Sequence, residues 1–369
     1  MEGTASASAA SHIGRDDFLI IIVVGSKYAR EGGNLRISAL FSGKCPSPPI
    51  SHFPEANSGQ AYRVSEHTPH AKLVGLVLIC SVLWGSAFPS IKYVYGIWEM
   101  DFAATYLFAG VRFTVAGFLI FLVLAKSKPF ERLKKANFRL LAALTLLQTV
   151  GQYTFFYWAM SVSSGALGAL LVSAGSLWWV ILSPIFLKSP IPTGKQIAIL
   201  LMCSAGIILA MSRPGAGSGD PLLGGVLFLL SSLSGVLGII FLQPLSKTID
   251  VPTATGFSLF AGGIILTVIG LPAIDQISQF TDLRVAGMTA YLTFVSAAAF
   301  TLWNSLSRKY PVNILAGYRF LIPLSGVILS ALFIPGEKIG AGIYAGGSIV
   351  IVGIFLLAKL SPTPTSPVR

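Results

Sequence analysis

Ten apolar segments, each close to the length that crosses a lipid bilayer as a helix, dominate this sequence. An α-helix needs about 20 predominantly apolar residues to span the hydrocarbon core. Apolar and polar residues do not alternate along the segments, which argues against a β-barrel. We therefore expect an all-α integral membrane protein with ten transmembrane helices. The segments cover residues 73–95, 102–125, 138–160, 164–186, 195–212, 222–245, 253–273, 286–306, 313–334 and 339–358.

The scarcity of charged residues supports this class. Only 11% of the residues are charged and 54% are hydrophobic, whereas soluble domains carry roughly 25% charged residues. The net charge of +12 does not indicate a nucleic-acid partner, because the cations lie in short gaps between apolar segments. We therefore expect a lipid bilayer as partner and no nucleic acid.

The gaps between the segments predict an orientation. Residues 126–139 carry six cations against one acid, and the gaps at 188–195 and 308–309 are also basic. The gaps on the opposite side are poor in cations and hold acids such as Glu99 and Asp101. Because cytoplasmic loops carry the excess of Lys and Arg, the basic side is cytoplasmic. With an even number of segments, both termini are then cytoplasmic.

The first 71 residues differ from the rest, being rich in Ser, Gly, Ala and Pro. We expect a disordered tail, or a tail added by a wrongly assigned start; residues 361–369 form a short C-terminal tail. A transit peptide would be Ser-rich but poor in acids, which Glu2, Asp16, Asp17 and Glu31 do not fit. The cell membrane is the expected location, with an organelle inner membrane as the alternative if the tail is a transit peptide.

The chain shows signs of an internal duplication. When the sequence is shifted by 147 positions, the end of the fourth segment and the fifth align with the end of the ninth and the tenth, so that Gly206 meets Gly353. This predicts two halves of five helices, residues 72–212 and 221–360. Because five is odd, the second half is inverted. Inverted repeats are typical of secondary transporters, whose substrate site lies near the midplane between the halves.

Three stretches carry a family resemblance. LWGSAFPSIKY (83–93) resembles the Trp-Gly…Lys opening of EamA-type transporters of the drug/metabolite transporter superfamily. GVRFTVAGFLIF (110–121) is similar to their second helix, and YRFLIPLSGVILSALFIPGE (318–337) to their ninth. The resemblance covers about 72–360. It implies a ten-helix inverted-repeat carrier of small metabolites or drugs, often working outward.

The same resemblance leaves the substrate open. Members include amino-acid exporters, and more distant relatives carry nucleotide sugars or sugar phosphates. The sequence departs from internal symmetry at one place, where Gly336 and Glu337 align with Ser189 and Pro190. Glu337 has no symmetry mate, which puts a paired acidic gate in doubt.

Three cations inside the apolar segments are candidates for substrate binding. They are Lys92, Arg112 and Arg319, and a charge within a membrane is costly. Arg112 can bond helix carbonyls or a substrate carboxylate or phosphate; Lys92 can reach the outer surface or an outward mouth, and Arg319 can reach inward. No Asp or Glu lies in any segment, and all four histidines are in the tail. Coupling to protons through a buried carboxylate is therefore not expected.

Amides and aromatic rings supply the remaining candidates. Gln148 and Gln152 are one turn apart near Tyr153, so they can bind a polar solute or join two helices. Trp84 and Trp178 can form a cavity wall, although Trp178 also fits an aromatic belt. Asn304 can bond locally or contact substrate.

Backbone-weakening residues predict flexible points. Gly85 and Pro89 lie in the first segment, where a carrier would use a bend or a broken helix. The other candidate hinge or gate residues are Pro184, Pro323 and Glu337.

These features favour a secondary transporter, an exporter or exchanger of amino acids or related carboxylate-bearing solutes. Carriers of sugar phosphates, nucleotide sugars or hydrophobic drugs are the alternative, and a receptor or scaffold without transport is a third interpretation. An enzyme is not expected, since no intramembrane His, Asp or Glu can serve as a base. No cofactor and no metal are expected. The sequence leaves a homodimer open.

Overall fold

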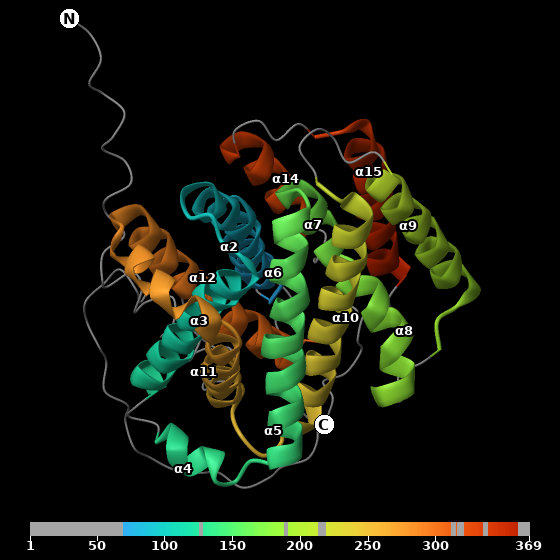
Figure 1. The fold of residues 1–369 in the computed structure, drawn as a ribbon. Coiled ribbons are helices and arrows are strands. Elements are labelled where there is room, and N and C mark those ends of the chain that lie inside the picture. Colours follow the sequence, from blue (N-terminus) through green and yellow to red (C-terminus); the bar gives the residue numbers. More distant parts are fainter. Residues whose placement is uncertain are drawn as a thin grey trace, which may run out of the picture.

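The computed structural model describes residues 69–124, 128–187, 191–212, 219–310, 315, 321–334 and 339–360. All regular elements in these ranges are helices (Figure 1). The first half contains α2 (Pro69–Ile97), α3 (Phe102–Leu124), α4 (Pro129–Leu133), α5 (Phe138–Leu144), the π-helix η3 (Thr145–Gly151), α6 (Gln152–Val162), α7 (Gly165–Val172), α8 (Gly175–Leu187) and α9 (Gly194–Ser212). The second half contains α10 (Pro221–Leu245), α11 (Val251–Ile269), the 3₁₀-helix η4 (Leu271–Thr281), α12 (Leu283–Lys309), α14 (Leu321–Phe333) and α15 (Ala341–Leu360).

Seven helical stretches in the described ranges are long and apolar enough to cross a membrane. They are α2, α3, α7 together with α8, α9, α10, α11 and α12. The predicted segment 138–160 falls in α5, η3 and α6, which follow one another without a gap. Of the last two predicted segments, residues 321–333 form α14 and residues 341–358 lie in α15. The all-helical, multi-pass class is confirmed, while the count of ten spans stays a prediction.

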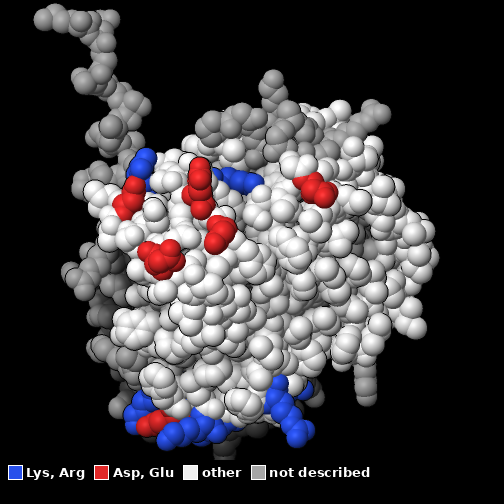
Figure 2. All heavy atoms as spheres, in the orientation of Figure 1, with Lys and Arg blue, Asp and Glu red and all other residues white. Residues whose placement is uncertain are grey.

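Charged side chains gather at two ends of the molecule. Figure 2 shows a wide uncharged band between them on the face drawn, with Lys and Arg prevailing at the end that carries α4 and the start of α5. Acidic residues prevail at the opposite end. An uncharged belt between two charged rims is the surface that a bilayer requires, because charges are costly in the hydrocarbon core.

Polar residues mark several helix starts. Ser164 precedes α7 and accepts a hydrogen bond from the backbone N–H of Leu167, 3.2 Å long. Asp220 precedes α10 and accepts two backbone N–H groups, and Pro221 takes the first helical position. These side chains satisfy backbone donors that have no partner within the helix.

The contacts between helices repeat in a pseudo-symmetric pattern. α3 packs on α11, and α9 on α15, on opposite sides of the molecule (Figure 1). Between them, α2 contacts α12 and α14, while α10 contacts α6 and the pair α7–α8. When the five segments of the first half are exchanged in order with those of the second, the contacts α3–α11 and α9–α15 map onto themselves. The contact of α2 with α12 then maps onto that of α10 with α6, and the contact of α2 with α14 onto that of α10 with the pair α7–α8.

Glycines allow the two outer pairs to approach closely. A Cβ on Gly346 of α15 would lie 2.8 Å from the backbone nitrogen of Ala210 in α9, and one on Gly353 would collide with Cys203. Small residues at such crossings let helix backbones meet, which replaces hydrophobic driving force within lipid.

Three predicted segments differ in detail from the structure. The segment 253–273 leaves the α-helical form at Gly270, and Pro272 lies in the first turn of the 3₁₀-helix η4 that follows. The segment 164–186 is interrupted between α7 and α8, where Ser173 turns its hydroxyl back to the carbonyl of Leu170. The segment 138–160 contains the π-helix η3. By contrast, α2 continues through Pro89 as one helix, so a broken helix, one of the two alternatives for the first segment, is not present in this conformation.

Candidate functional site

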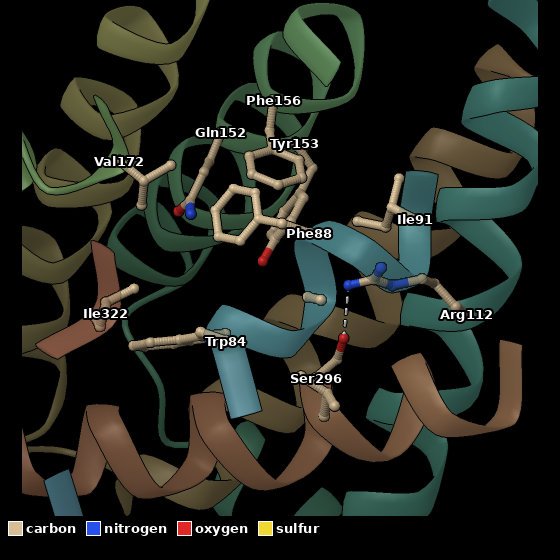
Figure 3. A pocket seen from close by; sticks show the side chains of 12 residues that line it. Trp84, Phe88, Ile91, Arg112, Gln152, Tyr153, Phe156, Val172, Ser296 and Ile322 are labelled. Carbon is tan, nitrogen blue, oxygen red and sulfur yellow. Dashed lines mark hydrogen bonds between the residues drawn. The ribbon is translucent and has the colours of Figure 1, made fainter. Parts of the chain in front are cut away.

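A cavity of about 70 Å³ lies between helices of both halves (Figure 3). Its walls come from α2, α3, α6, α7, α12 and α14. Apolar side chains form most of the lining, and few polar groups reach it, as is usual for small-molecule sites. The lining residues are Trp84, Ala87, Phe88, Ile91, Arg112, Gln152, Tyr153, Phe156, Val172, Val295, Ser296 and Ile322.

Arg112 of α3 brings a buried positive charge to this cavity. Only 2% of the residue is exposed. Its guanidinium donates a hydrogen bond to the Ser296 hydroxyl at 3.0 Å (Figure 3). It donates a second one to the Tyr157 hydroxyl at 2.6 Å. Its Nε is buried without a hydrogen-bond partner, and no carboxylate within the described ranges forms an ion pair with it. A buried charge with neutral partners alone is costly, and an anion at this place would offset that cost.

Aromatic rings surround the guanidinium. Its central carbon lies 4.4 Å from the ring centre of Phe113, 5.6 Å from that of Tyr157 and 5.9 Å from that of Tyr153. Cation–π attraction to these rings partly stabilises the charge. On the other side of the cavity, Trp84 packs edge-on against Phe300 at 5.6 Å between ring centres. The cavity can therefore hold an apolar group beside an anionic one.

Gln152 supplies a neutral polar group to the same space. Figure 3 shows its amide between Val172 and Phe88, turned toward the cavity. Its side chain makes no hydrogen bond with another described residue, and the Ser231 hydroxyl donates to its backbone carbonyl instead. A second cavity of about 40 Å³ shares Trp84, Gln152 and Val172 with the first. Gln152 and Trp84 thus lie between two adjoining spaces.

Gln148 and Asn304 bind each other. Each side-chain amide donates to the other's carbonyl oxygen at 3.1 Å, and Asn304 also donates to Thr255 at 3.0 Å. Asn304 is fully buried and borders neither cavity, whereas Gln148 borders the smaller one. This reciprocal pair joins η3 to α12, which is the helix-joining alternative for Gln148. Asn304 makes this bond to another helix and not a local one.

We expect Gln148→Leu to destabilise the protein by about 1 kcal/mol, because Asn304 would lose its amide partner. The double variant Gln148→Leu/Asn304→Leu should lose less than the sum of the two single variants. Thermal melting of the purified protein in detergent measures both effects. Additive losses would mean that the pair contributes no coupling energy.

The other predicted residues lie around the cavity or away from it. Lys92 donates to the backbone carbonyl of Met160 at 2.5 Å, and Trp178 donates to Ser232 at 3.1 Å. Neither Lys92 nor Trp178 lines either cavity.

Gly85, a candidate hinge residue, packs against α14, where an added Cβ would lie 2.8 Å from the backbone nitrogen of Gly326. Pro89 and Pro323 are buried, Pro184 is half-buried within α8, and Arg319 and Glu337 lie outside the described residues.

Several cavity residues carry no distinctive sequence signal. Phe88, Ile91, Phe156 and Ile322 are apolar like their neighbours in the same helices. Tyr157, which binds Arg112, lies one helical turn after Tyr153 in α6, and that spacing is the one signal that could have found it.

Backbone irregularities occur beside the cavity. The π-helix η3 ends at Gly151, directly before Gln152 and Tyr153. The turn between α7 and α8 follows directly after Val172. π-helical turns are rare in proteins, and those that do occur are often found at functional sites. The position of η3 therefore supports the cavity as the functional centre.

Comparison with known proteins places the chain among transporters. The family model described as the EamA-like transporter family matches residues 71–212 and 222–359. The chain is 23% identical over 296 residues to the uncharacterised transporter YvbV of Bacillus subtilis (strain 168), covering 78% of this chain and 92% of that protein. It is 23% identical over 290 residues to a protein of Salmonella typhimurium described as a probable amino-acid metabolite efflux pump, covering 76% and 93%. A known crystal structure, 16% identical, superposes with a TM-score of 0.55 over 78% of this chain and 98% of that chain, which indicates a shared fold.

Proposed function

Because the chain belongs to the EamA-like transporter family and is a multi-pass membrane transporter, we propose that it carries small carboxylate-bearing metabolites such as amino acids. It works as an exporter or exchanger, by alternating access across the cell membrane. The binding site is the cavity between α2, α3, α6, α7, α12 and α14. The chain itself catalyses no reaction.

The observation that carries this proposal is the buried guanidinium of Arg112. It lies at the cavity wall with an unpartnered Nε and, within the described ranges, no ion pair. Arg presents a planar set of donors that matches a carboxylate. In the proposed complex, Arg112 binds the carboxylate, Gln152 and Tyr153 bind a second polar group, and Trp84 packs on the apolar part.

The proposed topology has ten spanning helices in two inverted repeats, residues 72–212 and 221–360, with both termini cytoplasmic. The pseudo-symmetric contacts of α3 with α11 and of α9 with α15 support the repeats. The basic rim around α4 supports the orientation, since cations prevail on the cytoplasmic side. A site between two such halves can open to either side in turn.

A phosphate-bearing solute is the alternative, because a guanidinium also binds phosphate. The size of the cavity favours the smaller ligand. About 70 Å³ beside one buried cation suits an amino acid better than a nucleotide sugar with two charged phosphates.

Counterflow in proteoliposomes tests the proposal. Purified protein in vesicles preloaded with unlabelled amino acids should accumulate labelled ones, and accumulation should be indifferent to a pH gradient. His70 lies in the first turn of α2, before the apolar span that begins at Leu73, and no described apolar span contains Asp, Glu or His that could take up a proton. At the acidic rim, hydrogen bonds from Arg284 lower the pKa of Asp282 to about 2, so this carboxylate stays ionised from pH 5 to 8.

Each other outcome changes a different part of the proposal. Accumulation that follows the pH gradient would contradict the absence of proton coupling and would direct attention to the rim acids Glu99 and Asp101. No counterflow with any amino acid, while sugar phosphates exchange, would replace the proposed substrate class and keep the role of Arg112.

A further inference from the structure

A groove at the basic end of the molecule shares no residue with the two central cavities. It has a volume of about 330 Å³ and lies between the C-terminal end of α3 and the short helix α4. Phe118, Phe121 and Leu122 of α3 form one wall, and Phe130 of α4 forms part of the other. Lys128, which precedes α4, lies at the rim.

The apolar walls are open to the surroundings of the protein. Phe118 is 50% exposed, Leu122 is 54% exposed and Phe130 is 66% exposed. Phe121 is buried and contacts Phe130, with 5.3 Å between their ring centres. On a membrane-spanning helix, exposed apolar residues face lipid tails, so the groove continues the lipid-facing surface of α3.

The position of α4 is fixed by an ion pair. Arg132 donates to Asp250 at 2.9 Å, which ties α4 to the start of α11. The other described cations of residues 128–139, of which Lys128 lines the groove, form no such tie. Lys128 has an exposed ion pair with Glu131 at 3.4 Å, which contributes little. Lys134, Lys135 and Arg139 are exposed, and no ion pair of theirs occurs among the described residues.

The geometry points to an anionic phospholipid as the occupant of this groove. Part of an acyl chain would pack on Phe118, Leu122 and Phe130, and the phosphate would lie near Lys128, Lys134 and Lys135. A soluble anion would not use the apolar walls, and a zwitterionic lipid would gain little from uncompensated cations. Basic residues next to a membrane attract anionic headgroups, and buried apolar area adds to the binding.

Lipid binding to the purified full chain in mild detergent tests this site. Native mass spectrometry counts bound dioleoylphosphatidylglycerol and dioleoylphosphatidylcholine, which have the same acyl chains. We expect preferential retention of the anionic lipid, weakened by high salt. The variant Lys134→Gln/Lys135→Gln should bind it about fivefold more weakly or worse. Phe130→Ser should also reduce binding, by removing the apolar wall.

The control variant is Lys195→Gln, which removes an exposed cation at the start of α9. α9 packs on α15 and has no substantial contact with α3 or α4, so this variant should bind like the wild type. Equal retention of the two lipids, or unchanged binding by both groove variants, would overturn the proposal. Displacement of the lipid by millimolar inorganic phosphate would also overturn it, because the site would then be a simple anion site. None of these results bears on the transported substrate.

Discussion

Replacing Arg112 by Gln should reduce counterflow of carboxylate-bearing solutes about 100-fold, because hydrogen bonds to a charged group contribute about 1.5–3 kcal/mol. The loss should appear mainly as weaker substrate binding. Arg112→Lys should fall between the wild type and the Gln variant, since Lys keeps the charge but lacks the planar set of donors. The measurement is counterflow in proteoliposomes, with the amount of inserted protein determined for each variant.

A structural role for Arg112 would give a different pattern. The guanidinium is buried with two hydroxyl partners and one unpartnered nitrogen. Gln can still donate to Tyr157 or Ser296, and removing a poorly compensated buried charge is often neutral for stability. We therefore expect the melting temperature of Arg112→Gln to equal or exceed that of the wild type. A fall in stability that parallels the loss of transport would assign Arg112 to structure rather than to binding.

The matched control is Arg139→Gln, the same change at an exposed cation of α5. It should leave counterflow unchanged. A second control varies the solute, since an amide analogue of a transported acid lacks the charge that Arg112 would bind. A folded Arg112→Gln protein with normal counterflow would remove this residue from the site.

The helical class and the central cation were predictable from sequence because the bilayer imposes strict rules. An apolar segment must become a helix, and a cation within it must find partners. Arg112, Trp84, Gln152 and Tyr153 were singled out for polarity or aromatic character, and they border one cavity although they come from three helices. Their roles in transport stay predictions.

The orientation of individual side chains was not predictable. Gln148 and Gln152 both border the smaller cavity, but only Gln152 reaches the larger one. The π-helix η3 wraps more residues per turn than an α-helix, which changes which neighbours a side chain faces. The partner of Gln148, Asn304, is 156 positions away, and no local pattern reveals such a pair. The apolar walls are equally hidden, because Phe88 and Phe156 resemble residues that face lipid.

Gly117→Ala should destabilise the protein by about 1–3 kcal/mol, the usual cost of overpacking. An added Cβ at Gly117 of α3 would lie 2.6 Å from the backbone oxygen of Gly256 and 2.7 Å from the Cα of Phe260, both in α11. Backbone atoms cannot rotate away as a side chain can, so the two helices must separate. Thermal melting in detergent measures the loss.

The expected change in stability is opposite in direction to the usual effect of replacing Gly by Ala in a helix. Within a helix, Ala is normally about 1 kcal/mol more favourable than Gly. Gly287 of α12 is exposed, and an added Cβ there would meet nothing within 4 Å. Gly287→Ala should therefore be neutral or stabilising, whereas Gly117→Ala should lower the melting temperature.

Because α3 also carries Arg112, separating α3 from α11 should shift the guanidinium and impair counterflow in the protein that remains folded. Equal counterflow by the folded Gly117→Ala and Gly287→Ala proteins would show that the close crossing of α3 and α11 does not hold the guanidinium of Arg112 in place.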